Sequence, residues 1–432
     1  MARLKKLTEK NFLKDLYQIF NFETEEELEK RKVRLFPIGK TTDENQTTSI
    51  FLATLSAVKE YREELFNQIG IKKINNQNIK LHIYTEIPSM SKEDRPDGLI
   101  VITSGIHNPV IEWISFVESK IGNQDIEINQ IENYIKLGKE IGIENIITIS
   151  NELVSLPTES PVNINNRVKF NLYHWSWIYL SVTAGRLLNG NVVKDEDHVY
   201  ILQELRRYFN SHNGIKNYTG MEKNWKEITE EFVDKSNKNL IDEIIKSYKQ
   251  EEKDICLQLI EDTGHFVDLK ITNKSREELI RASLEKNKTI TSIFYINGNP
   301  NKTFNLDIDF VSRKISCSTR YTIENGKAKA QTTRLLSMFL KDVSNEDDIL
   351  IGAIYPRRTI SNTVYKSLSQ LIREKEEGNY SINNKDYGDT VKEFDIKIVE
   401  DLGKDFHRPQ LIVTKLETLS KLFLEKVFIV LK

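Results

Sequence analysis

The chain has 432 residues, a length that at roughly 100 to 200 residues per domain predicts two or three domains with room for hydrophobic cores. Hydrophobic residues at 39%, aromatic residues at 9% and charged residues at 29% exclude a disordered or fibrous protein. Lysine and arginine number 62 against 64 acidic residues, so a nucleic acid would have to bind a local basic surface, because the formal net charge is −2.

The cysteines and the N-terminus predict where the protein resides. Cys256 and Cys317 lie far apart, whereas a secreted chain of this length normally carries more cysteines in a disulfide framework. The first residues include Glu9 and Asp15 and lack the continuous apolar core of a signal peptide. No run of about 18 apolar residues occurs, so no transmembrane helix and no membrane partner are expected. We therefore expect a cytoplasmic protein.

The first regular elements are a helix and three strands. Apolar residues spaced three, four and seven apart predict an amphipathic helix over residues 46–69. Three extended segments follow, beginning at Ile79, Gly98 and Val110. The last two are rich in β-branched and aromatic residues, and the turn-forming residues 104–109 between them predict a hairpin.

A second helix and a further strand complete this pattern. Helical spacing predicts a helix over residues 127–141, which Gly142 ends. Residues 144–153 contain a short apolar run that is typical of a strand buried on both faces. The stretch from Val168 is expected to begin extended and to become helical near Ser176. The order is therefore helix, three strands, helix, strand.

The character of the sequence changes in its second half. Residues 190–215 are rich in asparagine and glycine and mark the weakest point of the first domain. We place this domain at residues 1–212, with a core at about 45–180, and an α+β domain for substrate or partner recognition at residues 213–432. The elements expected in the second domain are a charged helix at about 225–260, strands from Thr291, Thr303, Lys314 and Asp348, and helices around 363–375 and 416–424.

Three charged residues near the predicted hairpin carry the chemistry. Glu118 and Lys120 are two positions apart on a strand, so they project to the same face. Asp97 directly precedes the partner strand, and strand pairing can bring its carboxylate beside Glu118. Paired carboxylates suit Mg²⁺, which lowers the pKa of a bound water, while an amine can stabilise negative charge in phosphodiester hydrolysis. Ser119 would offer a metal at most its backbone carbonyl.

With these residues the sequence resembles the PD-(D/E)XK nuclease superfamily. Pro96-Asp97 matches the first motif of that family and Glu118-Ser119-Lys120 the second, and the element order matches its core. The resemblance covers about residues 45–180. It implies an α/β restriction-endonuclease-like core, a mixed sheet flanked by helices, and hydrolysis that depends on Mg²⁺ or Mn²⁺.

The resemblance also assigns residues on the two helices. Gln130 and Tyr134 look like the QxxxY signature of the RecB-like branch, and as residues i and i+4 they share one helical face. The family often adds an acid from the first helix as a metal ligand, and Glu60 is our choice, with Glu63 and Glu64 as rivals. Core packing remains the alternative role for Tyr134, and solvent exposure the alternative for Glu60.

The second domain contains a local excess of positive charge. Around a predicted β-meander only Glu324 opposes the basic residues, and a further pair, Arg357 and Arg358, follows the next strand. Such an excess can contact phosphates, although solvated strand faces explain it equally well. The residues that we assign to nucleic-acid binding are Arg313, Lys314, Arg320, Lys327 and Lys329, with Arg334 nearby.

These observations predict a Mg²⁺-dependent nuclease that acts on DNA, with endonuclease favoured over exonuclease activity. The pairing of the core with an accessory domain suggests, by analogy alone, restriction or antiviral defence, with a second copy or a defence-system protein as partner. The alternative is a catalytically silent nucleic-acid-binding or assembly protein that keeps the fold. A second Glu-x-Lys triplet, Glu251-Glu252-Lys253, is expected to be only a solvated helix face.

Overall fold

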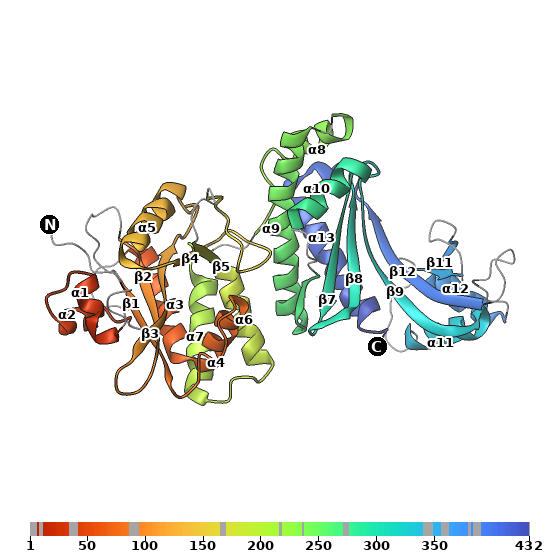
Figure 1. The fold of residues 1–432 in the computed structure, drawn as a ribbon. Coiled ribbons are helices and arrows are strands. Elements are labelled where there is room, and N and C mark those ends of the chain that lie inside the picture. Colours follow the sequence, from red (N-terminus) through yellow and green to blue (C-terminus); the bar gives the residue numbers. More distant parts are fainter. Residues whose placement is uncertain are drawn as a thin grey trace. The chain divides into compact units, whose positions relative to one another are not determined.

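The protein is described here from a computed structural model of all 432 residues. The residues it describes are 7, 12–33, 42–85, 95–164, 170–215, 218–235, 237–270, 276–339, 349–355, 363–378, 382 and 390–431, without the side chains of 323–325. The chain divides into two compact units, Met1–Tyr218 and Thr219–Lys432. Residues 213–218 thus belong to the first unit rather than to the second domain of the sequence prediction. Each unit is mixed in structure, with a sheet flanked by helices (Figure 1).

The first unit is built on a mixed five-stranded sheet in the order β1-β2-β3-β4-β5. The first three strands pair antiparallel, and β3, β4 and β5 pair parallel. The parallel step from β3 to β4 runs through helix α5, because a parallel connection needs a crossover. The strands are β1 Ile79–Thr85, β2 Gly98–Ser104, β3 Val110–Ser119, β4 Asn145–Ser150 and β5 Asn171–Ser176.

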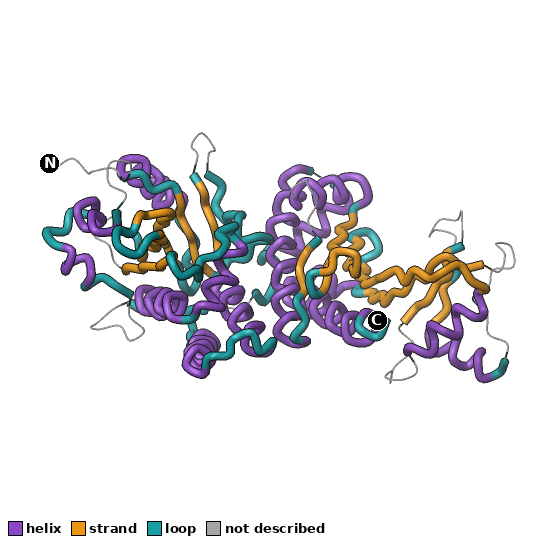
Figure 2. Tube along the Cα trace, turned by 60° about the horizontal axis from the view of Figure 1, so that its bottom comes forward, coloured by secondary structure: helices purple, strands orange, loops and turns teal. Residues whose placement is uncertain are grey.

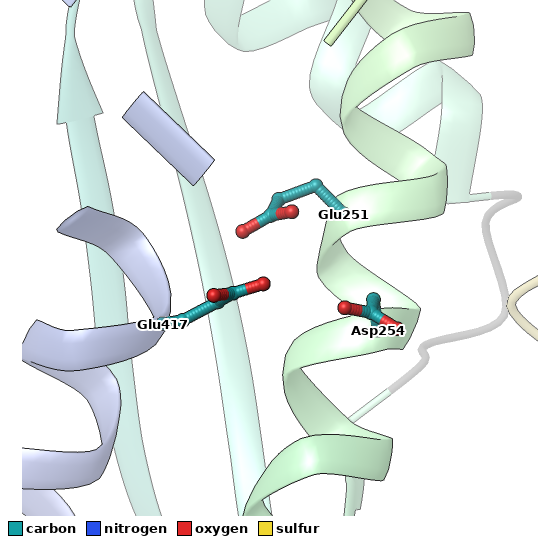
Figure 3. Close-up of side chains that lie close together, drawn as sticks. All are labelled: Glu251, Asp254 and Glu417. Carbon is teal, nitrogen blue, oxygen red and sulfur yellow. The ribbon is translucent and has the colours of Figure 1, made fainter. Parts of the chain in front are cut away.

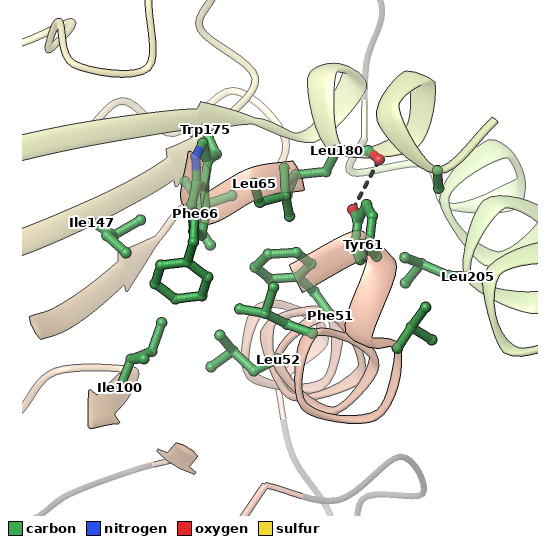
Figure 4. Packing of buried hydrophobic residues seen from close by; sticks show 14 of the residues in the cluster. Phe51, Leu52, Tyr61, Leu65, Phe66, Ile100, Ile147, Trp175, Leu180 and Leu205 are labelled. Atoms are coloured by element: carbon green, nitrogen blue, oxygen red, sulfur yellow. Dashed lines mark hydrogen bonds between the residues drawn. The ribbon is translucent and has the colours of Figure 1, made fainter. Parts of the chain in front are cut away.

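Helices cover both faces of this sheet (Figure 2). On one face Ile100, Val117 and Trp175 share a core with four helices, which Figure 4 shows around Phe51. On the other face Leu99 and Phe116 pack against the remaining helices. The helices of the first face are α3 Asp43–Ala57, α4 Lys59–Gln68, α6 Trp177–Asn189 and α7 Glu196–Ser211; those of the second are α1 Leu16–Ile19, preceded by the short turn η1 Leu13–Asp15, α2 Glu25–Glu29 and α5 Ile128–Ile141.

Two glycines of the first unit are required by their positions. Gly142 ends α5 with a φ of 85°, the left-handed conformation that glycine adopts without a steric cost. At Gly98, directly after Asp97, an added Cβ would lie 2.8 Å from Leu52 Cδ1 and 3.3 Å from Val117 Cβ. The absence of a side chain at Gly98 therefore sets how closely α3 packs on the sheet.

The helix predicted over residues 46–69 is wrong as a single helix. It is two helices, α3 and α4, because Val58 between them is extended, with φ −93° and ψ 104°. The Gly- and Asn-rich region at 190–215 holds α7, which begins where Asp195 accepts hydrogen bonds from the backbone of Asp197 and His198. The predicted change from strand to helix near Ser176 is confirmed, because Ser176 ends β5 and caps α6.

The second unit is built on an antiparallel seven-stranded sheet in the order β11-β10-β12-β9-β8-β7-β6. Its two longest strands, β9 and β12, run from the region of α9 and α13 to that of α11 and α12 (Figure 1). The strands are β6 Val267–Leu269, β7 Thr289–Ile296, β8 Asn299–Asp309, β9 Lys314–Lys327, β10 Ile349–Ile354, β11 Tyr365–Ser367 and β12 Thr390–Asp401.

Two of the helices predicted in the second unit are corrected. The helix expected at 225–260 is α8 and α9, and α9 restarts where Asn237 caps it by accepting from the backbone N–H of Leu240. The helix expected from residue 363 begins as β11, which pairs with β10. The helices are α8 Trp225–Asp234, α9 Lys238–Thr263, α10 Arg276–Asn287, α11 Ala328–Phe339, α12 Leu368–Glu376 and α13 Pro409–Phe423, with short helical turns η4 Gly403–His407 and η5 Leu424–Phe428.

Among the described residues, no helix combines the length and the apolar character that crossing a bilayer requires. Both cysteines, Cys256 and Cys317, are free thiols and are buried.

Candidate active site

The end of the β2–β3 hairpin brings two predicted acidic residues together. Gly98 pairs with Val117 in the antiparallel register, so the next residues, Asp97 and Glu118, lie side by side. Asp97 Oδ2 accepts hydrogen bonds from the backbone N–H of Ser119 at 2.8 Å and from its hydroxyl at 2.9 Å. The donors of Ser119 are thus used to hold Asp97, and the metal contact through its carbonyl stays a prediction.

Glu118 is the most deeply buried charged group of the cluster, with 1% of its surface exposed. Lys120 Nζ donates to its Oε1 at 2.5 Å, and the Tyr134 hydroxyl donates to its Oε2 at 2.7 Å. Glu118 and Tyr134 face the same side of the sheet, because Phe116 two residues earlier packs against the Tyr134 ring with centroids 5.9 Å apart. The shared face predicted for Glu118 and Lys120 is confirmed by the bond between them.

The surroundings raise the pKa of all three predicted groups, Asp97, Glu118 and Lys120. Burial raises the pKa of Glu118 to about 8, and the negative charge of Asp97 adds to this effect. Burial also raises the pKa of Asp97, against the hydrogen bond from the backbone of Ser119. Burial acts to lower the pKa of Lys120, but the carboxylates around it, Glu118 first, outweigh burial and leave this pKa raised. The lysine therefore stays charged, while the two acids share more negative charge than their surroundings favour.

Gln130 and Tyr134 contact each other as the predicted motif requires. They lie one turn apart on α5, and Gln130 Nε2 donates to the Tyr134 hydroxyl at 3.0 Å. Tyr134 is fully buried and belongs to the core on its face of the sheet, so core packing and contact with the site are combined in one residue. Gln130 is linked to Glu118 through this tyrosine.

The first turns of α3 contribute two residues that the sequence prediction missed. Glu44 Oε1 lies 3.4 Å from Lys120 Nζ, and Thr48, one turn later, shares a 2.5 Å hydrogen bond with Ser119. Thr42 caps α3 by accepting from the backbone N–H of Asn45, so the helix begins at Asp43, three residues before the predicted start. The capping signal of Thr42, followed by two acids, could have placed Glu44 on the helix.

Glu60, the first-helix acid that we predicted, contacts His198 rather than this cluster, and the helix acid beside Lys120 is Glu44. Glu60 is on α4, and its carboxylate is 3.0 Å from His198 Nδ1 of α7. An α-helix rises 1.5 Å per residue, so the end of α3, where α4 begins, is roughly 20 Å from Glu44. The rivals Glu63 and Glu64 also lie on α4 and have partners of their own. The break at Val58 is the reason, because it separates α4 from the helix that reaches the site.

A cavity of about 540 Å³ is lined by residues that flank Lys120 and Glu44 in the sequence. Ile121 and Gly122 line it after Lys120, together with Tyr208 of α7 and His212, the residue directly after α7. Thr47 lies 2.9 Å from the Tyr208 hydroxyl and 3.3 Å from His212 Nε2, so α3 holds both rings in place. The remaining lining residues are Asp43, Gln46, Asn123, Gln124, Ser211, Asn213 and Gly214.

The basic residues of the second unit do not form one compact patch. Lys314 and Lys327 are at opposite ends of β9, roughly 40 Å apart along a strand that rises about 3.3 Å per residue. Arg313 is exposed in the turn before β9, and Lys329 is exposed on α11 beside Lys327. Arg320 lies in the middle of the strand. Contact of these residues with a nucleic acid stays a prediction.

Acids from β12 oppose two of these basic residues. Lys314 Nζ is 3.7 Å from Asp401 Oδ2, and Arg320 Nη1 is 3.7 Å from Glu393 Oε2. The expectation that only Glu324 opposes the positive charge is therefore wrong, because pairing of β9 with β12 brings in acids that are distant in the sequence. Arg357 and Arg358 lie outside the described residues, as does the side chain of Glu324.

The second Glu-x-Lys triplet is buried, contrary to our expectation of a solvated face. Glu251 and Glu252 are fully buried and Lys253 is 7% exposed, because the middle of α9 packs between other elements of the second unit. Glu252 accepts two 2.9 Å hydrogen bonds from Arg276 Nε, and Lys253 is 3.2 Å from Asp268. Burial of this helix comes from tertiary packing, which the charge pattern alone could not reveal.

Comparison of the chain with models of known families, with curated proteins and with solved structures found no match.

Proposed function

We propose that this protein is a divalent-cation-dependent nuclease of the PD-(D/E)XK superfamily that hydrolyses phosphodiester bonds in DNA. The observation that carries the proposal is the buried Glu118 carboxylate, bonded to Lys120 and adjacent to Asp97 where β2 and β3 meet. A buried ion pair contributes little to stability compared with apolar residues of the same volume. Strongly shifted pKa values among clustered charges favour a functional site.

The topology of the first unit supports the same assignment. A helix that supplies an acid, three antiparallel strands, a crossover helix and a parallel strand follow one another as α3, β1, β2, β3, α5 and β4, with α4 inserted after α3. This is the order that the restriction-endonuclease-like core requires. The two motif residues Asp97 and Glu118 lie at the same end of the paired strands β2 and β3. Helix α5 carries Gln130 and Tyr134, and Tyr134 contacts Glu118.

The donor set fits a hard divalent cation such as Mg²⁺ or Mn²⁺. Asp97 and Glu118 would hold it, with Glu44 near enough to add a third carboxylate, and carboxylate oxygens are the ligands that these ions prefer. Both hydrogen bonds to Asp97 reach Oδ2, and within the described part of the chain its Oδ1 accepts none. A bound cation would activate a water and offset the charge of the phosphate.

The remaining groups of the site have distinct tasks in hydrolysis. Lys120 stays charged, so its amine can donate to a phosphate oxygen and stabilise the negative charge that develops there. Tyr134 donates to Glu118 and thereby orients its carboxylate, and Gln130 holds the tyrosine. Thr48 and Ser119 link the first turns of α3 to Asp97. Rigid support of this kind holds the reacting groups at fixed positions.

The biological setting that we propose rests on the same analogy. A nuclease core followed by an antiparallel α+β unit suits a defence or restriction enzyme that cuts internally, with the second unit contacting DNA, a second copy of the chain or a partner protein. Two free, buried thiols are consistent with a reducing cytoplasm.

The test is cleavage of plasmid and single-stranded DNA by the full chain with Mg²⁺, Mn²⁺ or EDTA. We expect cleavage that needs the cation and that Glu118→Gln abolishes. Glu112→Gln is the matched control, because Glu112 lies on the same strand but is exposed. Cleavage by Glu118→Gln, or cleavage unaffected by EDTA, would contradict the proposal. DNA binding without any cleavage would instead support the catalytically silent alternative.

A further inference from the structure

The second unit holds a separate group of three carboxylates between its helices α9 and α13. Glu251 and Asp254 project from α9, and Glu417 projects toward them from α13 (Figure 3). One oxygen of each residue lies within 4.8 Å of an oxygen of the other two. Glu251 and Asp254 are buried, at 0% and 1% exposure, and Glu417 is half-buried.

Glu251 has no hydrogen-bond partner among the residues that the structure describes. Both of its carboxylate oxygens are buried, and neither has a hydrogen-bond partner in the part of the chain that the structure describes. The side chain points toward Asp254 and Glu417 (Figure 3). An unpartnered buried carboxylate is costly, so something outside these side chains must compensate it.

A proton would compensate Glu251 less completely than a cation. Burial raises the pKa of Glu251 well above its usual value, and it raises that of Asp254 to about 7. A protonated Glu251, however, would carry a hydroxyl that needs an acceptor, and its buried oxygens have no hydrogen-bond partner among the described residues. A cation would instead satisfy all three carboxylates at once.

The spacing of the oxygens matches a single ion. Oxygen ligands lie about 2.0 to 2.6 Å from Mg²⁺ or Ca²⁺, so ligands on opposite sides of one ion are roughly 4 to 5 Å apart. Gln258 Nε2 donates to Asp254 Oδ2 and to Glu417 Oε1, each at 2.6 Å, and thereby holds these two carboxylates in place. Such support for ligands is usual around bound metals.

We propose that Glu251, Asp254 and Glu417 bind a hard divalent cation, Mg²⁺ or Ca²⁺, that joins the first long helix of the second unit to the last. All three ligands are oxygens, which excludes the nitrogen and sulfur ligands that zinc favours. The site lies entirely within the second unit and does not depend on the function proposed for the first. Its role is structural, because binding an ion only in the folded state stabilises that state.

The test uses the full chain carrying Asp97→Asn and Glu118→Gln, so that the carboxylates of the first unit do not bind the added metal. Mg²⁺ and Ca²⁺ are titrated separately by isothermal calorimetry after treatment with EDTA, and melting is followed with and without each ion. We expect one ion per chain and a higher melting temperature. Adding Glu251→Gln should weaken binding by more than the roughly 10- to 100-fold that loss of an outer partner costs.

Glu261→Gln is the control, since Glu261 is exposed on the same helix, and it should leave binding unchanged. If Glu251→Gln does not fold, Glu417→Gln at the half-buried position should give the same loss. Absence of binding and of any melting shift with both ions would overturn the proposal. Unchanged binding in Glu251→Gln or Glu417→Gln would overturn it as well.

Discussion

Each of the two units buries a group of carboxylates, and the groups differ in where their positive charge comes from. In the first unit Glu118 is paired with Lys120, so the chain itself supplies a cation to the acids. In the second unit Glu251 faces two further acids and lacks any such partner among the described residues. A built-in lysine leaves a charge free for chemistry on a substrate, whereas a group without one has to take up a proton or an ion.

A third arrangement lies directly beside Glu251. Glu252 is equally buried, but Arg276 donates to both of its oxygens. Neighbouring residues of one helix thus place one carboxylate in a saturated ion pair and the other in an unsaturated cluster. Burial alone therefore does not tell a structural acid from a ligand, and the partner has to be known.

The largest expected effect is on the free energy of unfolding, in which variants of Glu252 and Glu251 should differ. Without divalent ions, Glu252→Gln should lower the free energy of unfolding by about 3 to 5 kcal/mol, because it leaves Arg276 buried without its counter-charge. Glu251→Gln should leave that free energy unchanged or raise it, because the amide replaces a carboxyl group whose charged form burial disfavours. Denaturation by urea in EDTA measures both variants. Equal losses would show that the two glutamates are compensated in the same way.

The lysine that distinguishes the first group can be removed directly. Lys120→Ala should slow DNA cleavage by about 10²- to 10³-fold, the usual cost of one group that stabilises transition-state charge. Folding should persist, because Glu118, whose pKa burial raises to about 8, can keep a proton when the lysine is lost. Lys136→Ala on the exposed side of α5 is the control and should cut normally. A fully active Lys120→Ala would remove Lys120 from the mechanism.

Both acidic groups should make the metal-free protein less stable as the pH rises. The pKa of Glu118 is raised to about 8, and that of Asp254 to about 7, so the folded state keeps protons that the unfolded chain releases near pH 4. For each such proton the free energy of unfolding falls by at most about 1.4 kcal/mol per pH unit between the unfolded and the folded pKa. Stability should therefore fall from pH 4 to 8. Thermal melting in EDTA across this range measures the slope, which Glu118→Gln should reduce. An unchanged slope would mean that Glu118 is ionised throughout.

The smallest effect is expected from the basic residues of the second unit. If Arg313, Lys314, Arg320, Lys327 and Lys329 contact phosphates, replacing all five by Gln should flatten the salt dependence of DNA affinity. The slope of log affinity against log salt concentration should change by less than about 0.9 for each residue replaced. The reason is that Lys314 and Arg320 already face Asp401 and Glu393. A filter-binding titration at several salt concentrations gives the slope. No change would leave DNA contact to the first unit.

The central pair of the candidate site was predictable because it depends on one local strand pairing. Asp97 and Glu118 flank a hairpin whose alternating residues define its register, so their meeting follows from the sequence. The contact of Gln130 with Tyr134 follows from helical spacing in the same way. These contacts all involve residues close together in the chain or in one element.

The predictions failed where tertiary packing or a single backbone conformation determines the structure. Glu44 was not among the candidate helix acids, which were Glu60, Glu63 and Glu64, because the extended conformation of Val58 and the early cap at Thr42 were not foreseen. The burial of α9 and the acids facing β9 come from segments far away in sequence, and β12 was not predicted at all. Composition could not reveal these contacts, because the same charged residues also suit a solvated face.

Gly98 has a consequence for how sequence variation in this protein would be interpreted. Any side chain at this position meets Leu52 of α3, and a shift of α3 would carry Glu44 and Thr48 away from Lys120 and Ser119. A library selected for activity would therefore select against bulky substitutions at Gly98, although a glycine has no group that takes part in chemistry. Intolerance to substitution at this edge of the sheet would report the spacing between helix and sheet as much as the reacting groups themselves.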